Sequence, residues 1–248
     1  MAFMAFRPTL WPTLFTVPAL ILLLGLGTWQ LERLEWKEGL IATRTARSTG
    51  PEIALPADAA PAASYEWSRT RATGRLLNDK ELYLAARSMN GNVGYRVVTP
   101  LLEADGSAVL IDRGWIPNER KDPGTRAAGE LAGEVAIGGL LRGSQRQSWL
   151  VPDNEPQHNV WFYVDTAAMG AAAGLAHTHP YFIEADATPN PGGYPIGGQS
   201  NLELPNNHLQ YAITWYCFAL TLAVIYVLYH RKLEAERKAA AKAAEAKG

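Results

Sequence analysis

Two long apolar runs lie near the two ends of the 248-residue chain. Residues 8–31 carry no charged side chain, and neither do residues 204–230. About 20 helical residues cross a hydrocarbon core roughly 30 Å thick, so each run is long enough to span a membrane. The pattern therefore predicts transmembrane helices over residues 10–29 and 209–229.

The first helix is expected to continue beyond its apolar run. Leu34, Leu40 and Ile41 recur at helical spacing, which extends the predicted helix to about Ser48. Residues 54–63 are rich in Ala and Pro and predict a loop. The first run is longer than the roughly 7–15 apolar residues of a cleaved signal peptide, so we expect it to be retained.

The middle of the chain has the β-branched and aromatic content of short strands, separated by Asn-Gly, Asp-Gly and Pro-Gly turn signals. We expect strands at residues 66–77, 81–87, 95–102, 108–115, 135–141, 160–165 and 181–184. Asp165 followed by Thr166 predicts an N-cap and a short helix to about Leu175. Short strands with few helices favour a mostly antiparallel sheet, closed or nearly closed into a barrel.

These elements predict a membrane protein in which two transmembrane helices flank a mostly antiparallel, barrel-like β domain with a minor helix. The expected parts are a cytoplasmic lead at residues 1–9, a transmembrane helix at 10–29, an outward-facing β-rich domain at 30–208, a second transmembrane helix at 209–229, and a basic cytoplasmic tail at 230–248.

Charge distribution supplies the expected orientation. The chain after the second apolar run carries six basic and three acidic residues, whereas the middle carries 16 basic and 21 acidic. Lys and Arg close to a span stay on the cytoplasmic side, so both termini are expected there. The domain would then face the periplasm of a bacterium, across the inner membrane, or the intermembrane space in a mitochondrial relative. The acidic middle argues against nucleic acid as a partner.

Cysteine chemistry contributes little to this chain. Its one cysteine, Cys217, lies within the second apolar run, so no disulfide can form inside the chain. The middle domain must therefore depend on its hydrophobic core.

His208 is the sharpest candidate for a binding residue, because it lies at the outward mouth of the second predicted helix. Tyr211 and Trp215 follow at i+3 and i+7 on the same helical face. A neutral imidazole at an apolar–water boundary, backed by aromatic rings, could ligate a haem iron. Alternatively, His208 caps the helix or bonds a loop carbonyl, and the aromatic residues form an interfacial belt.

The outer edge of the first predicted span offers a matching stripe of side chains. Trp29, Arg33 and Trp36 are spaced i, i+4 and i+7. They could form the facing wall of a site shared with His208, with Arg33 pairing a carboxylate. Interfacial anchoring by the two tryptophans, with an arginine reaching toward water, explains the same spacing.

Other motifs have simpler explanations. The glycine-rich residues 192–198 lack the Lys-Ser/Thr of a phosphate loop and are expected to form a tight backbone path. His177 and His179 could bind a metal, with Glu184 and Asp186 as the oxygen ligands near them in sequence. Alternatively, they are ordinary loop histidines that bind no metal.

Motifs of catalytic chemistry are weak in this chain. Asp112 and Arg113 could be catalytic or could form a salt bridge at a strand end. No Gly-x-Ser-x-Gly elbow and no redox cofactor motif is present. We therefore do not expect an enzyme.

The chain resembles the surfeit locus protein 1 family, the Shy-type assembly factors for cytochrome c oxidase. The matching blocks occur in family order between the two apolar runs, and all six together are far more specific than any one. They are GTWQLERLEWK at Gly27, VVTPLL at Val97, DRGWIP at Asp112, WFYVD at Trp161, PGGYPIGGQ at Pro191 and NNHLQYAITWY at Asn206. Asp112 departs from the Asn that often begins the third block.

This resemblance implies an outward β-rich domain and a role in building the catalytic subunit of cytochrome c oxidase. It implies transient binding of haem a, with the haem-associated histidine falling on His208, and haem a synthase as a further candidate partner beside membrane lipid. Tyr211, Trp215, Trp29 and Arg33 are carried over more loosely as neighbours of that site. The competing hypothesis is a scaffold that holds the oxidase subunit and never ligates haem.

Overall fold

The computed structural model describes residues 8–246, and the chain divides into two compact units. One unit contains the described chain up to Ala42 together with the chain from Glu203, and the other is Thr43–Leu202. Residues 1–7 of the predicted lead and residues 247–248 of the predicted tail lie outside the described residues. The membrane boundaries at residues 10–29 and 209–229 stay predictions.

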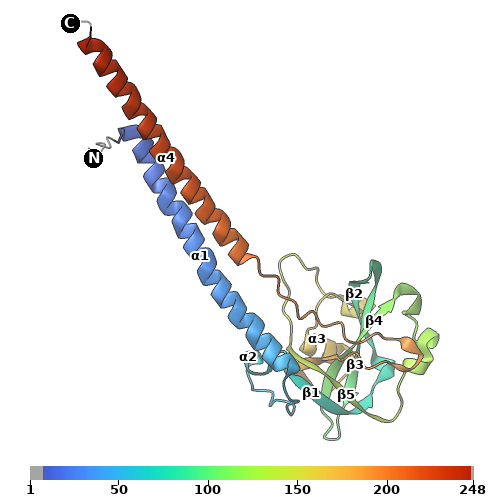
Figure 1. Ribbon diagram of the computed structural model, residues 1–248. Coiled ribbons are helices and arrows are strands. Elements are labelled where there is room, and N and C mark those ends of the chain that lie inside the picture. The colour runs from blue at the N-terminus through green and yellow to red at the C-terminus, as the bar shows by residue number, and fades with distance from the viewer. Residues whose placement is uncertain (1–7, 247–248) are drawn as a thin grey trace. The chain divides into compact units, whose positions relative to one another are not determined.

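The first unit is built from two long helices, α1 (Leu10–Thr49) and α4 (His208–Glu245) (Figure 1). In the described chain, these are the two helices long and apolar enough to cross a membrane. In the most apolar 18-residue stretch of each helix, only 6% of α1 and 11% of α4 is buried. The core helix of a water-soluble domain would be mostly buried. α1 continues to the predicted helical end near Ser48, and α4 continues as helix through most of the predicted tail.

The two helices run antiparallel and are joined by polar side chains. The backbone N–H of Thr9 donates to Nε2 of His230 at 3.1 Å. Farther along α1, the hydroxyls of Thr13 and Tyr226 lie 2.6 Å apart. In an apolar environment such groups have no water to bond, so pairing between helices both satisfies them and sets the helix register.

Small residues are among the buried positions of the two helices. A Cβ atom at Gly27 would lie 2.8 Å from the ring of Tyr216, so the glycine allows this contact. Ala212 and Ala219 are the buried small residues on α4. Close packing of small side chains is the usual way in which apolar helices associate.

The second unit is a β barrel. Its described strands are β1 (Arg69–Leu76), β2 (Leu82–Met89), β3 (Asn92–Leu102), β4 (Ala108–Pro117), β5 (Glu134–Gly143), β6 (Val160–Trp161) and β7 (Thr178–Ala185). They form one sheet in the order β1-β5-β7-β4-β3-β2-β6, and an additional β1–β3 pairing closes five of these strands into a ring. β2 and β6 extend from β3 outside that ring.

The expected barrel-like, mostly antiparallel fold is confirmed, with two parallel pairings. β4 pairs with β7 in parallel, and β2 pairs with β6 in parallel. The remaining ladders are antiparallel. Parallel neighbours require a crossover connection, and the chain between β4 and β7 includes β5, β6 and α3 (Thr166–Ala172).

Burial follows the barrel geometry. β1 alternates strictly between exposed and buried residues, as a strand with one solvated face should. β4 is buried from Ala108 to Ile116, because neighbours cover it on all sides. The largest fully buried apolar side chains are Trp161, Tyr181, Phe182, Leu101, Leu110, Ile111, Ile116, Leu141, Met169 and Ile183.

Two local predictions can be compared directly with the structure. Asp165 caps α3 as predicted, its carboxylate accepting from the backbone N–H of Ala168 at 3.0 Å. The first strand, predicted from residue 66, begins only at Arg69. The cause is Trp67, whose φ of 71° breaks the strand and whose ring lies beneath the guanidinium of Arg142 at 3.7 Å.

The glycine-rich segment at residues 192–198 runs beside β4, as a tight backbone path can. Trp115 and Ile196 exchange two backbone hydrogen bonds of 2.9 and 2.8 Å. Gly114 permits this pairing, since its φ is +119° and a Cβ there would collide with the Ile196 carbonyl. The DRGWIP and PGGYPIGGQ blocks therefore contact each other directly through their backbones.

The charged pair at Asp112 and Arg113 forms structural ion pairs, as one of the two interpretations predicted. Asp112 lies 2.8 Å from Arg96, while Arg113 lies 3.6 Å from Glu81 on the other side of the strand. Glu81 also accepts from Arg126 at 3.0 Å. Burial raises the pKa of Asp112 and lowers the pKa of Arg113, and the opposite charge beside each opposes the shift.

Replacing Gly114 should destabilise the barrel. We expect Gly114→Ala to lower the free energy of unfolding by about 2–4 kcal/mol, because the new Cβ meets the Ile196 carbonyl and the positive φ becomes strained. Urea titration of the detergent-solubilised protein, followed by near-ultraviolet circular dichroism, measures this change. Gly106→Ala is the matched control, with a φ of +89° and open space around it, and should cost only about 1 kcal/mol.

Replacing Glu81 should leave two buried arginines without their shared counter-ion. Removing one partner of a buried ion pair lowers the free energy of unfolding by about 3–5 kcal/mol. We expect the loss caused by Glu81→Gln to lie near the lower end of this range. Glu52→Gln is the control, because the Glu52–Arg71 pair is exposed and solvent screens it. Equal unfolding midpoints for the two variants would contradict a stabilising role for the Glu81 cluster.

Candidate functional site

His208 is the first residue of α4. Pro205, Asn206 and Asn207 precede it, and a proline followed by small polar residues commonly marks the start of a helix. The backbone N–H of His208 reaches the side-chain oxygen of Asn206 at 3.4 Å. The imidazole does not cap its own helix, because its ring bonds a residue of α1.

The ring of His208 is held by Gln30. Its Nδ1 lies 2.6 Å from Oε1 of Gln30, and the imidazole is half-buried. A carbonyl oxygen only accepts hydrogen bonds, so Nδ1 carries the proton and Nε2 presents its lone pair. Metal-bound histidines are arranged in this way, with one ring nitrogen bonded to a carbonyl or carboxylate and the other left for the metal.

Tyr211 and Trp215 lie along α4 on the His208 side, as the spacing predicts. Tyr211 is 55% exposed. Trp215 is half-buried and packs edge-on against Phe218, with ring centroids 6.1 Å apart. The described contacts of both residues do not include His208, so their part in a shared site stays a prediction.

Trp29 lies on α1 immediately before Gln30, and Arg33 lies one helical turn after it. The guanidinium of Arg33 lies 3.9 Å from the ring centre of Trp36, a cation–π contact. Trp29 is 50% exposed. The described contacts do not join either residue to His208 or Arg33 to a carboxylate, so the facing wall of a shared site stays a prediction.

Apolar surface adjoins the start of α4. A shallow hollow of about 410 Å³ is lined by Asn206, Asn207, Leu209, Gln210, Ile213 and Thr214. Leu209 and Ile213 are 51% and 55% exposed. The first turns of α4 therefore carry both the polar contact of His208 with Gln30 and exposed apolar side chains.

Gln30 is the residue that the sequence did not single out. It lies 178 positions from His208 along the chain, so local spacing could not pair them. One signal was available, namely an uncharged amide three residues after Gly27 in an otherwise apolar run. Small residues followed by a hydrogen-bonding side chain are typical of a helix face that packs on another helix.

Comparison with known proteins agrees with the resemblance of the motifs. The profile of the SURF1 family matches residues 17–220. A SURF1-like protein of Monosiga brevicollis is 37% identical over 232 residues, which cover 88% of this chain and 87% of that protein.

Two vertebrate relatives give the same result. Surfeit locus protein 1 of Rattus norvegicus is 36% identical over 222 residues, covering 84% of this chain and 71% of the relative. The Homo sapiens protein of the same name is 36% identical over 225 residues, which cover 84% of this chain and 73% of that protein. Similarity of this extent, over both apolar helices and the barrel between them, shows that the chain belongs to the SURF1 family.

Proposed function

We propose that this protein is an assembly factor for cytochrome c oxidase that binds haem a through His208 and assists its insertion into the catalytic subunit. Family membership supports the assembly role. The observation that carries the haem proposal is the His208–Gln30 hydrogen bond of 2.6 Å, which fixes the ring and leaves Nε2 as a ligand atom. In this proposal haem a is cargo, and the protein performs no catalytic step.

The surroundings of His208 suit such a cargo. Haem a is strongly apolar, so its passage through water is unfavourable. Half-exposed rings of Tyr211 and Trp29, together with Trp215, offer surface for the macrocycle. Arg33 offers a cation for a propionate. A single histidine ligand also favours release, because the oxidase supplies a stronger ligand set.

The proposed setting is the inner membrane of a bacterium. The tail from residue 231 carries the net positive charge, so we propose that both termini are cytoplasmic and that the β domain lies on the opposite side. Haem a could then pass laterally from a membrane-bound haem a synthase to the oxidase subunit without crossing water.

A scaffold that never ligates haem is the second candidate, and one observation favours it. Thr9 bonds His230 between the same two helices, so a histidine in this helix pair can serve only to align α1 with α4. His208 would then be needed for its shape and its hydrogen bond, and the oxidase subunit would be held by the protein surface.

Absorbance spectra distinguish these candidates. When the protein is co-expressed with haem a synthesis and purified in detergent, we expect a haem a spectrum that is lost in His208→Ala. His158→Ala is the control, because His158 is an exposed histidine paired only with Glu155 in the structure. A colourless wild type under haem-replete conditions, or full haem content in His208→Ala, would favour the scaffold.

Gln30 should influence haem affinity without touching the iron. Replacing the hydrogen-bond partner of a ligating histidine typically weakens binding about 10–100-fold, so Gln30→Leu should weaken it by about that factor. Titration of haem a into the haem-free protein measures this effect. Thr13→Val removes a different interhelical bond, to Tyr226, and should leave the affinity unchanged. Equal affinities for both variants would show that Gln30 acts only in helix pairing.

A further inference from the structure

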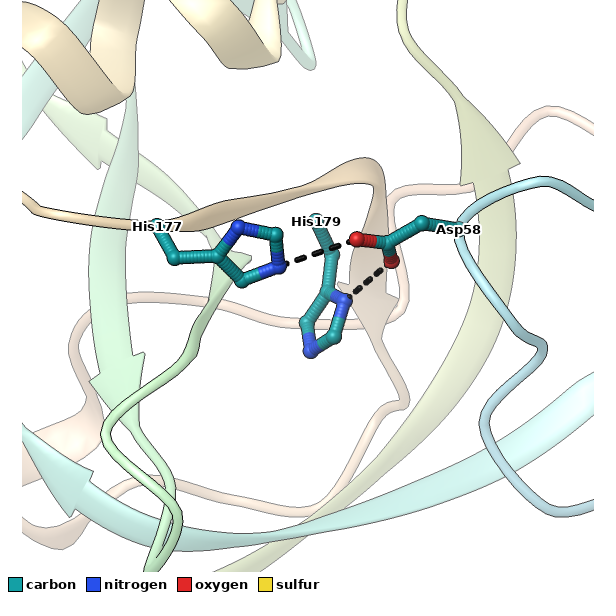
Figure 2. A group of neighbouring side chains, drawn as sticks. All are labelled: Asp58, His177 and His179. Carbon is teal, nitrogen blue, oxygen red and sulfur yellow. Dashed lines mark hydrogen bonds and ion pairs between the residues drawn. The ribbon is translucent and has the colours of Figure 1, made fainter.

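Three side chains with metal-binding chemistry meet on the barrel. They are Asp58, His177 and His179 (Figure 2). Nε2 of His177 lies 2.9 Å from one oxygen of Asp58, and Nδ1 of His179 lies 2.6 Å from the other. The potential ligand atoms all lie within 4.8 Å of one another.

The oxygen ligand is a different one from those that the sequence suggested. Glu184 and Asp186 were the nearest acidic residues along the chain. Glu184 instead bonds Arg142 at 2.7 Å. It lies five residues along β7 from His179, about 16 Å in an extended strand, too far to share a ligand set with it. Asp58 comes from the loop before α2 (Ala62–Tyr65), which the sequence could not place beside β7.

His179 is fixed in position on all sides of its ring. Its Nε2 lies 2.9 Å from Oε2 of Glu103, and its ring stacks on Tyr181 with centroids 4.9 Å apart. Only 15% of the side chain is exposed. A carboxylate on the far nitrogen of a histidine is the arrangement that orients ligating histidines and raises their basicity.

The loop that carries Asp58 is also held in place. The hydroxyl of Tyr181 donates to the carbonyl of Pro56 at 3.0 Å, and a turn closes between Ala57 and Ala60 at 2.8 Å. Tyr181 thus contacts both the histidine ring and the loop. The three ligand side chains are gathered by the fold itself, and an incoming ion would not have to order them.

We propose that Asp58, His177 and His179 bind a divalent transition-metal ion, with zinc the best fit to the donor set. Two imidazoles and one carboxylate are typical zinc ligands. Ca²⁺ and Mg²⁺ prefer sites made of oxygen atoms alone. The half-exposed His177 leaves room for water as a further ligand. The ion would replace the protons that now lie between the imidazoles and Asp58.

A metal at this position would connect the segment before α2 to β7. Asp58 and His179 lie 121 residues apart in the chain, so the ion would close a long loop and stabilise the folded state by mass action. This inference is independent of the proposed haem function, because none of its residues lies near α4 in the chain.

The test uses the full-length detergent-solubilised protein, stripped with chelator and titrated with Zn²⁺ against a chromophoric zinc indicator. We expect wild type to bind one equivalent more than His177→Ala at low micromolar zinc, or with at least about tenfold higher affinity. His177 is suitable because its side chain is 55% exposed and contacts only Asp58 and His179. His158→Ala, which alters another exposed histidine–carboxylate pair, should bind like wild type.

Thermal unfolding supplies the second readout. Saturating Zn²⁺ should raise the unfolding midpoint of wild type and of His158→Ala by a few degrees, and should leave His177→Ala unchanged. Equal zinc binding by wild type and His177→Ala, with equal midpoints, would overturn the proposal. The cluster would then be a pair of histidine–aspartate ion pairs.

Discussion

The buried strand β4 is the element on which the barrel depends. It is covered on both faces and paired on both edges, so each polar group on it must find a partner inside the protein. Asp112 pairs with Arg96 on one side of the strand. On the other side, Arg113 forms an ion pair with Glu81 and donates to the carbonyl of Gly129. The backbone beyond them is satisfied by the glycine-rich segment, through the hydrogen bonds between Trp115 and Ile196.

The same requirement applies to the helix pair, because α1 and α4 are apolar enough to cross a membrane and their polar groups are paired between the helices. Near one end His208 bonds Gln30, and near the other His230 bonds Thr9. Both histidines thereby set the register of the helices. In both, Nδ1 faces a carbonyl oxygen, of Gln30 for His208 and of Tyr226 for His230. They differ at Nε2, which accepts the Thr9 N–H in His230 and has no described hydrogen bond in His208.

Much of the fold could be predicted from the sequence because it is encoded locally. Apolar length defined the two long helices, and alternation with turn signals located the strands. The details that escaped prediction depend on contacts between distant segments. Trp67 interrupts the first strand because it packs against Arg142. Gln30 and Asp58 each join a histidine more than 100 positions away, which no local spacing reveals.

The open edges of the sheet have a consequence for pairing with other strands. β1 joins β3 only at Arg75 and Leu76, so in the described sheet the open edges are the earlier part of β1 and the edge formed by β2 and β6. β6 pairs with β2 over only two residues, and the chain of β2 is interrupted at Ala86, whose φ is 54°. A short, irregular edge is a poor template for a strand of another molecule. The edge at β6 is therefore expected to add little to strand pairing between molecules.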